Sequence, residues 1–162
     1  MDPDALGKLL DRHALALVLY ARQFCASPED VVQTALLKLV RLRIPPTNAV
    51  GWLFHAVRSA ALDASRSERR RQKHEAAAAS EGWFTNADDT AGLDARSAEE
   101  ALATLPLELR EVLVARIWGQ LTFEDIAAAM DSSAATCHRR YTEGLEMLRA
   151  RLGVKSEPGA KP

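Results

Sequence analysis

Two helix-start signals lie close together in residues 121–141, which read LTFEDIAAAMDSSAATCHRRY, and they restrict what this segment can form. Thr122, followed three residues later by Asp125, is a variant of the capping box that opens a helix. The D-S-S run at 131–133 then provides a tight turn and a second N-cap. Two short helices joined by such a turn form the helix-turn-helix that places its second helix in the DNA major groove. An ordinary helical hairpin with a solvated face has the same local signals, so the segment alone leaves both interpretations open.

The second of these helices is expected to have an apolar face and a polar face. Helical spacing turns one set inward: Ala134, Cys137, Tyr141, Leu145 and Leu148. The opposite face starts with small residues that permit close approach to bases, His138 or Arg139 can donate to guanine, and Arg140 can reach a phosphate. The candidate DNA-reading positions are therefore Ser133, Ala135, Thr136, His138, Arg139 and Arg140.

Helices are also predicted upstream of this segment. Apolar residues at three- and four-residue spacing indicate a helix from about Leu6 to Phe24, and a second helix starts directly afterwards. Ser27 is its expected N-cap and Pro28 its first residue, and the I-P-P run at 44–46 stops it.

A third, longer helix is expected from about Asn48 to the alanine run at 76–79, and its two faces differ. One face carries apolar residues for a core: Val50, Leu53, Phe54, Val57, Ala61 and Ala64. The other is a stripe of aromatic, polar and basic groups, which we call the polar stripe: Trp52, His55, Ser59, Asp63, Arg66 and Arg70. Such a stripe suits a nucleic-acid strand, because bases stack on aromatic rings and phosphates pair with basic groups. The basic run at 66–73 taken alone also fits a solvated helix end favoured by the macrodipole.

The charges are distributed unevenly, although 21 Lys+Arg and 22 Asp+Glu give a net charge of only -1. Residues 1–79 hold 12 basic and 8 acidic side chains, residues 80–100 hold 1 and 6, and residues 101–162 hold 8 and 8. The total excludes a uniformly basic nucleic-acid binder. The distribution indicates an electrostatic role for the first segment and an acidic connector behind it.

Taken together, these patterns predict an all-α protein of two small helical domains. The first is expected at 1–79 and the second at 99–152. Between them, residues 80–98 are acidic and lack an apolar period, so we expect a flexible acidic linker, and a disordered tail is expected at 153–162.

Enzyme chemistry finds little support in the residue pattern. The four histidines are scattered, no glycine loop for phosphate is present, and Cys137 and His138 are adjacent rather than spaced for zinc. We therefore expect no catalytic residue, no metal site and no cofactor, and a small hydrolase or metal enzyme is the least supported class. Two cysteines, no signal peptide and no apolar run of membrane length predict a cytoplasmic protein without membrane insertion.

Four motifs in sequence order resemble bacterial sigma-70 family factors of the extracytoplasmic-function group. They are S-P-E-D-V-V-Q, G-W-L-F-H-A-V-R-S-A-A-L-D, L-P-L-E-L-R-E-V-L and the T-F-E-D-I-A helix-turn-helix, and the resemblance covers about residues 5–75 and 99–152. It implies two helical domains that bind core RNA polymerase and direct it to promoter DNA, with no catalytic site of their own. A cognate anti-sigma protein is common in that family.

The resemblance also assigns roles to residues. It implies a helix that docks on a coiled coil of the largest catalytic subunit, through Asp30, Val32, Gln33 and Thr34. It implies recognition and melting of the minus-10 element by Trp52, Arg58, Ser59, Asp63 and Arg66, which overlap the polar stripe with its His55 and Arg70. It implies minus-35 recognition by Thr136, His138, Arg139 and Arg140.

Several positions depart from the family pattern. Thr34 stands where an acidic residue is usual, Ser59 replaces a frequent Asn, and Asp131 replaces a usual turn Gly. Glu143 and Glu146 occupy positions that are commonly basic, and carboxylates there repel phosphate. These departures leave a second class open, a sigma-like helical interaction protein that binds a partner without promoter reading.

Overall fold

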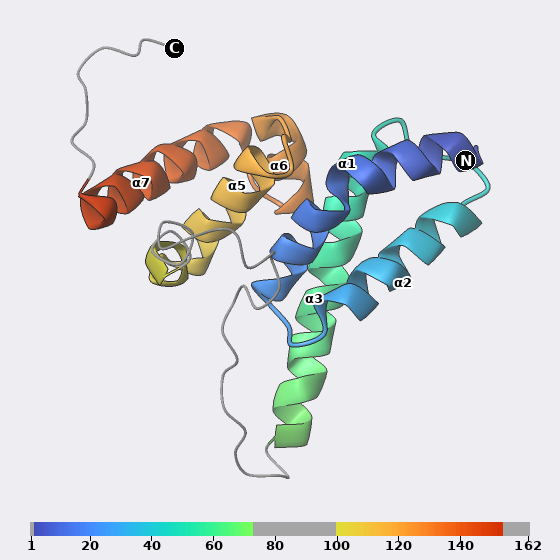
Figure 1. Cartoon of the computed structure of the whole chain (residues 1–162), viewed down its shortest axis with the longest axis horizontal. Coiled ribbons are helices and arrows are strands. Elements are labelled where there is room, and N and C mark those ends of the chain that lie inside the picture. Colours follow the sequence, from blue (N-terminus) through green and yellow to red (C-terminus); the bar gives the residue numbers. More distant parts are fainter. Residues whose placement is uncertain (1, 73–99, 154–162) are drawn as a thin grey trace.

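The computed structural model describes residues 2–72 and 100–153, which form helices and connecting loops without a strand (Figure 1). The helices are α1 (Pro3–Arg22), α2 (Pro28–Arg41), α3 (Ala49–Gln72), α5 (Leu107–Ile117), α6 (Phe123–Ala129) and α7 (Ala134–Leu152). The prediction of an all-α fold is confirmed. The predicted linker at 80–98 lies outside the described residues, as do the expected end of the third helix and all but the first residue of the predicted tail.

Local chemistry fixes both ends of α2 and the beginning of α3. Pro28 begins α2 as predicted and Ser27 is its N-cap residue, but the Ser27 side chain makes no capping hydrogen bond. The α2 helix ends at Arg41, where the backbone becomes extended ahead of the two prolines. Asn48 caps α3, since its Oδ1 accepts a 2.8 Å hydrogen bond from the Gly51 N–H.

Helices α1, α2 and α3 pack against one another and bury the faces that their apolar spacing predicts. On α3 the predicted core residues Leu53, Phe54, Val57 and Ala61 are buried. On the polar stripe, His55, Ser59, Asp63, Arg66 and Arg70 are exposed, and Trp52 is partly buried. The two faces of this helix therefore separate as the sequence indicates.

In the second half of the chain, α7 crosses α5 at close range. A Cβ placed on Gly144 would lie 2.8 Å from Leu113 Cδ1, which is closer than side chains normally approach. Leu113 packs with Leu102 and Leu105 under the partly buried Tyr141 and neighbouring residues of α7. The absence of a side chain at Gly144 lets the two helices come together over this small core.

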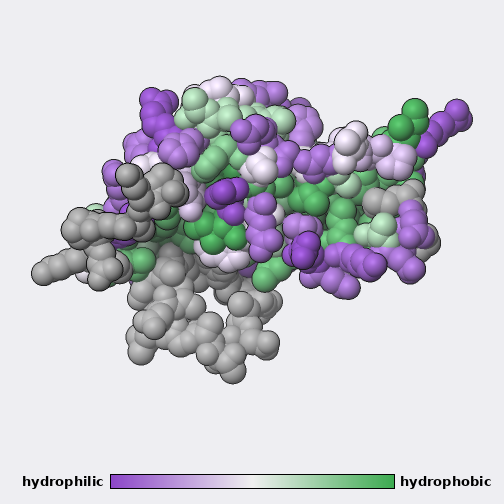
Figure 2. Space-filling view, turned by 90° about the horizontal axis from the view of Figure 1, so that it is seen from above, coloured by the Kyte–Doolittle hydropathy of each residue, from purple (hydrophilic) through white to green (hydrophobic). Residues whose placement is uncertain are grey.

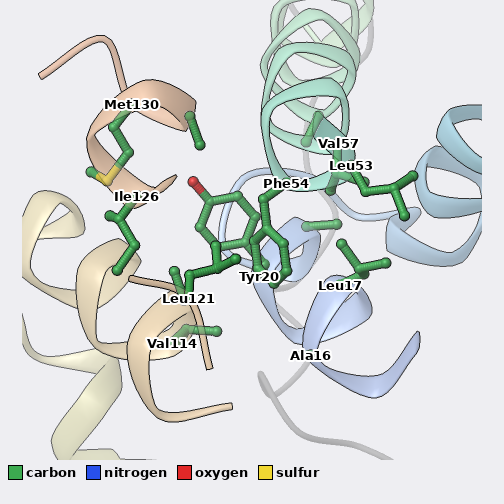
Figure 3. Close-up of a cluster of buried hydrophobic side chains, with 14 of the residues drawn as sticks. Ala16, Leu17, Tyr20, Leu53, Phe54, Val57, Val114, Leu121, Ile126 and Met130 are labelled. Atoms are coloured by element: carbon green, nitrogen blue, oxygen red, sulfur yellow. The ribbon is translucent and has the colours of Figure 1, made fainter. Parts of the chain in front are cut away.

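One hydrophobic cluster joins the two halves of the chain, as Figure 3 shows. Tyr20 of α1 lies beside Phe54 of α3, with ring centroids 5.0 Å apart, and Leu121 and Ile126 approach from the other half. Gly119, which follows α5, packs directly on the Phe54 ring, since a Cβ added to this glycine would lie only 2.7 Å from Phe54 Cζ. Burying one side chain of this size contributes roughly 1.5–3 kcal/mol. The two predicted domains thus share a core.

Candidate nucleic-acid and polymerase interface

The helix-turn-helix is built as its caps predict. The Thr122 side chain accepts a hydrogen bond from the Asp125 N–H, and the Asp125 carboxylate accepts one from the Thr122 N–H, which completes the capping box of α6. Asp131 occupies the left-handed region with φ 49°, which turns the chain between the helices. Ser133 then caps α7 by accepting a 3.1 Å hydrogen bond from the Thr136 N–H.

The candidate reading face of α7 is open to solvent. Ser133, Ala135, His138 and Arg139 are exposed, while Thr136 and Arg140 are partly buried. On the other side of the helix Cys137 is completely buried, as the helical spacing predicts. The departures Glu143 and Glu146 are also exposed, so their carboxylates lie on the surface of the same helix.

An aromatic side chain supports the start of this reading face. The Phe123 ring lies edge-on to His138, with centroids 5.2 Å apart, and also contacts Tyr141. The Arg116 guanidinium lies 4.8 Å from the centre of the same ring, and its Nη1 donates a 2.6 Å hydrogen bond to the Leu121 carbonyl. Sequence reasoning did not assign Phe123 or Arg116 a role, because a ring within a capped helix start has no distinctive spacing.

The polar stripe of α3 presents its charges mainly along its second half. Arg66 Nη1 lies 3.2 Å from Asp63 Oδ1, and both side chains are about 70% exposed. An exposed pair of this kind contributes about 0–1 kcal/mol to stability, so it leaves the Arg66 charge available to a ligand. Arg70 is exposed further along the same line. These groups could follow a phosphate backbone.

The beginning of α3, where the polar stripe starts, lies against α6 in the second half of the chain. Asn48 Nδ2 donates a 2.6 Å hydrogen bond to Asp125 Oδ1 of α6. His55 Nδ1 lies 3.4 Å from the carbonyl oxygen of Ala129, at the end of α6. The structure therefore places the beginning of the helix-turn-helix against the helix that carries the candidate minus-10 residues.

Among the candidate minus-10 residues, Arg58 contacts a buried side chain in the second half of the chain. Its Nε donates a 2.8 Å hydrogen bond to Glu111 Oε1 of α5, and Tyr20 Oη donates to the same oxygen at 3.4 Å. Glu111 is 2% exposed, so the interaction is buried on the carboxylate side. Sequence reasoning missed Tyr20 and Glu111, because partners 91 and 53 positions apart leave no local pattern.

Burial and the contacts among Glu111, Arg58 and Tyr20 together set the pKa values of these three groups. Desolvation raises the pKa of Glu111, and the hydrogen bond and charge of Arg58 offset only part of that effect. Burial also acts to lower the pKa of Arg58, but the hydrogen bond and charge of Glu111 outweigh it and raise that pKa. Burial, followed by the Glu111 charge, raises the pKa of Tyr20 well above its usual value, so the phenol keeps its proton and acts as a donor.

The candidate polymerase-docking residues occupy different sides of α2. Asp30, Gln33 and Thr34 are exposed, and Thr34 Oγ1 donates a 2.8 Å hydrogen bond to the Asp30 carbonyl. Val32 is buried in the core, so the structure does not bring its side chain to the surface with the other three. Three of the four predicted residues thus form an exposed polar group at the start of α2.

Some large hydrophobic side chains remain at the surface: Leu15, Leu37, Val40, Ile44, Ile117, Trp118 and Leu152. Leu37 and Val40 lie on the exposed side of α2, beyond the polar group of that helix, and Ile44 is 84% exposed in the loop that follows. Figure 2 shows hydrophobic residues between hydrophilic ones on the face seen from above. The α2 surface therefore combines polar and apolar groups, as docking surfaces on proteins often do.

Within residues 2–72 and 100–153, no three His, Cys, Asp or Glu side chains come together as a metal site would require. None of the helices in this described part combines the length and the apolar character needed to cross a bilayer. Burial raises the pKa of both Cys25 and Cys137, which lowers the reactivity of the two thiols.

Comparison with solved structures relates the whole arrangement to known folds. The chain is similar to the sigma factor RpoE in complex with the anti-sigma factor NepR from Bartonella quintana, with a TM-score of 0.75 and 22% identity over 96% of this chain and 100% of that one. It is also similar to CnrH in complex with the cytosolic domain of CnrY, with a TM-score of 0.61 and 21% identity over 96% and 92%. At these identities the likeness establishes the fold.

Comparison with family models covers both halves of the sequence. The model for Sigma-70 region 2 matches residues 9–71, and the model for Sigma-70, region 4 matches residues 95–148. No curated protein sequence matched the chain. Because both halves match in the order of the family, the chain belongs to the sigma-70 family, whose members direct core RNA polymerase to promoters, and it has the two-domain arrangement of the extracytoplasmic-function group.

Proposed function

We propose that this chain is a cytoplasmic extracytoplasmic-function sigma factor that reads promoters with two of its helices. The polar stripe of α3 recognises and holds the melted minus-10 element, and the exposed face of α7 recognises the minus-35 element. The observation that carries this proposal is that both surfaces occur in one chain, on elements matched by the region 2 and region 4 models.

On α3, the chemistry suits a single strand. Trp52 can stack on a base, the short polar Ser59 can donate to a base edge, and Arg66 and Arg70 can pair with phosphates. Binding energy that is available only to the separated strand shifts the opening equilibrium of the promoter toward the melted state. The α3 helix thereby promotes melting without a catalytic step.

On α7, the exposed Arg139 can form two hydrogen bonds with guanine in the major groove, and Arg140 can contact a phosphate. Glu143 and Glu146 repel the DNA backbone nearby. We therefore expect weak DNA binding by the second half alone, and useful promoter affinity only when polymerase and both readers are linked, which raises their effective concentration.

For polymerase docking, α2 offers Asp30 and Gln33 beside the apolar Leu37 and Val40. Polar residues give specificity to such a contact, and exposed apolar residues supply burial. The polymerase provides all catalysis, so this chain acts as a specificity subunit and not as an enzyme. By similarity to RpoE in its complex with NepR, an inhibitory protein of the anti-sigma type is the second partner that we propose.

The test is selection of transcribed promoters from a random DNA library, with purified core RNA polymerase and the full chain. The expected result is a population of selected promoters that share two conserved elements and that core polymerase alone does not transcribe. Core binding without initiation from any selected sequence would refute the proposal and support the alternative of a sigma-like interaction protein. Failure to bind core polymerase at all would also refute the proposed function.

A further inference from the structure

Phe123, the first residue of α6, lies where three helices meet. Its ring contacts His138 and Tyr141 of α7, with ring centroids 5.2 Å and 5.6 Å apart. The Arg116 guanidinium of α5 lies over the same ring, 4.8 Å from its centre. Phe123 thus joins a residue of the candidate reading face to the framework that carries it.

The Phe123 ring is held from two directions. The capping box of Thr122 and Asp125 fixes the backbone that carries the ring. The Arg116 guanidinium is attracted to the negative face of the ring. A 2.6 Å hydrogen bond from Arg116 Nη1 to the Leu121 carbonyl holds that guanidinium in turn. The ring is therefore a fixed surface beside α7.

The neighbouring residues His138 and Arg139 are both exposed, but their side chains are held differently. In residues 2–72 and 100–153, neither side chain makes a hydrogen bond or an ion pair. The His138 imidazole lies against the Phe123 ring at an interplanar angle of 73°. Aromatic rings attract each other in this edge-to-face orientation. The imidazole therefore has a preferred orientation before DNA binds, and Arg139 has no comparable contact in the described part of the chain.

An oriented imidazole favours the recognition of one base. A hydrogen bond to a base edge weakens steeply when the donor is turned away from the acceptor. A side chain that is already oriented also loses less conformational freedom on binding than a mobile one. Leucine in place of Phe123 would keep an apolar side chain at this position, but it would not orient the imidazole, because it has no ring quadrupole.

We propose that Phe123 is a positioning residue, which holds the imidazole of His138 in the orientation that reads one base pair of the upstream promoter element. This inference rests on the proposed role of α7 in minus-35 recognition. The chemical target is an acceptor in the major groove, N7 or O6 of guanine. Phe123 acts through His138 and makes no contact with the base.

The first experiment measures initiation by core RNA polymerase with the full chain, from promoters that carry each of the four bases at every position of the upstream element. His138→Ala identifies the base pair at which His138 contributes to preference. We expect Phe123→Leu to reduce the preference at the same base pair by about two- to tenfold, the cost of ordering a mobile side chain. Preference at the other positions, including the one set by Arg139, should match that of the wild type.

Two matched variants separate positioning from packing. Phe123→Tyr keeps the ring at a partly exposed position, so we expect it to retain the wild-type preference. Tyr141→Leu removes the other aromatic ring that Phe123 touches on α7, and we expect it to leave the preference at the His138 base pair unchanged. A loss of that preference in either variant as large as the loss in Phe123→Leu overturns the inference.

The double variant Phe123→Leu/His138→Ala tests whether Phe123 acts through His138. We expect it to lose no more preference at that base pair than His138→Ala alone, because the two changes remove one interaction. Losses that add overturn the inference. A loss in Phe123→Leu that is uniform over all upstream positions also overturns it, since a general loss of packing has that result.

The same assay separates this inference from the proposed function. A His138→Ala chain with unchanged base preference overturns the inference and leaves the proposed function intact, provided that the wild type initiates from selected promoters. A wild-type chain that initiates from no promoter overturns the proposed function, and this inference with it.

A measurement on the wild-type chain does not depend on whether Phe123→Leu folds. The chain is labelled with 13C in its histidine and phenylalanine rings and studied by NMR. We expect nuclear Overhauser contacts between the Phe123 and His138 rings, and an order parameter for the imidazole near that of rigid backbone, about 0.85. The absence of these contacts, or an imidazole order parameter below about 0.6, overturns the inference.

Discussion

Glu111 is the residue whose environment gives the protein a specific pH dependence. Burial raises its pKa above the usual 4.5 despite the nearby Arg58. The unfolded chain has the usual pKa at this site and the folded chain has the raised pKa. At a pH between the two, the folded chain binds more protons at Glu111 than the unfolded chain does. The contribution of Glu111 to the free energy of unfolding therefore falls as the pH rises through this range and is regained as the pH falls.

We therefore expect the stability of the wild type relative to Glu111→Gln to increase as the pH is lowered from about 7 toward 4.5. Urea denaturation of both proteins at a series of pH values measures this difference, and the comparison cancels the carboxylates that they share. A difference that does not vary with pH, or that decreases on acidification, contradicts the assignment of a raised pKa to Glu111.

Arg139 allows base reading to be separated from phosphate contact. If its guanidinium makes a bidentate contact with guanine, Arg139→Ala loses about 1–3 kcal/mol at one promoter position and relaxes the preference there. Transcription from promoters with single substitutions in the upstream element measures this change. Arg149→Ala, an exposed arginine in the last turn of α7, is the matched control. A uniform loss over all upstream sequences would assign Arg139 to a phosphate.

At the scale of elements, the end of α5 depends on a glycine. A Cβ at Gly119 would lie 2.5 Å from the Ala115 carbonyl oxygen and 2.7 Å from Phe54 Cζ. We expect Gly119→Ala to destabilise the chain by about 1–3 kcal/mol, because both neighbours are held in the core.

Gly7 of α1 is the matched control. It has nothing within 4 Å of its added Cβ, so Gly7→Ala should stabilise the chain by about 0.5–1 kcal/mol. Thermal or urea unfolding compares them, and equal effects would contradict the packing at Gly119.

The elements also show how far sequence reasoning reaches. Helix starts at Pro28, Thr122 and Ser133 were predictable, because caps and prolines act over three or four residues. The buried and exposed faces of α3 followed from spacing for the same reason. The Arg58–Glu111 contact was not predictable, because L-P-L-E-L-R-E-V-L gives no sign that its second glutamate, Glu111, is buried against another helix. Val32 was assigned by resemblance, and only packing shows that it is buried.

At the scale of the whole molecule, the hydrophobic core and the promoter-reading surfaces make different demands on the chain. The shared core of Tyr20, Phe54 and Ile126 favours a single compact body. Reading two promoter elements with polymerase between them favours two separate readers joined by a linker. The chain can meet both demands only if the contact between its halves is weak enough to be exchanged for contacts with polymerase and DNA. The polar groups in that contact make such an exchange possible. A phosphate can replace Glu111 as the partner of Arg58, and water can replace Arg58 as the partner of Glu111.

Docking through α2 should be independent of this exchange, since Asp30 and Gln33 are exposed in the compact form. We expect Asp30→Ala and Gln33→Ala each to weaken binding to core polymerase by about 1–3 kcal/mol, the usual range for a lost hydrogen bond to a charged or buried partner. Asp4→Ala removes an exposed acid from the first turn of α1 and is the matched control for the charge and for the helix end. Surface plasmon resonance with immobilised core polymerase gives the affinities, and circular dichroism verifies that each variant is folded. Folded variants that bind as tightly as the wild type would remove α2 from the docking surface, whereas a loss shared with Asp4→Ala would reduce the effect to net charge.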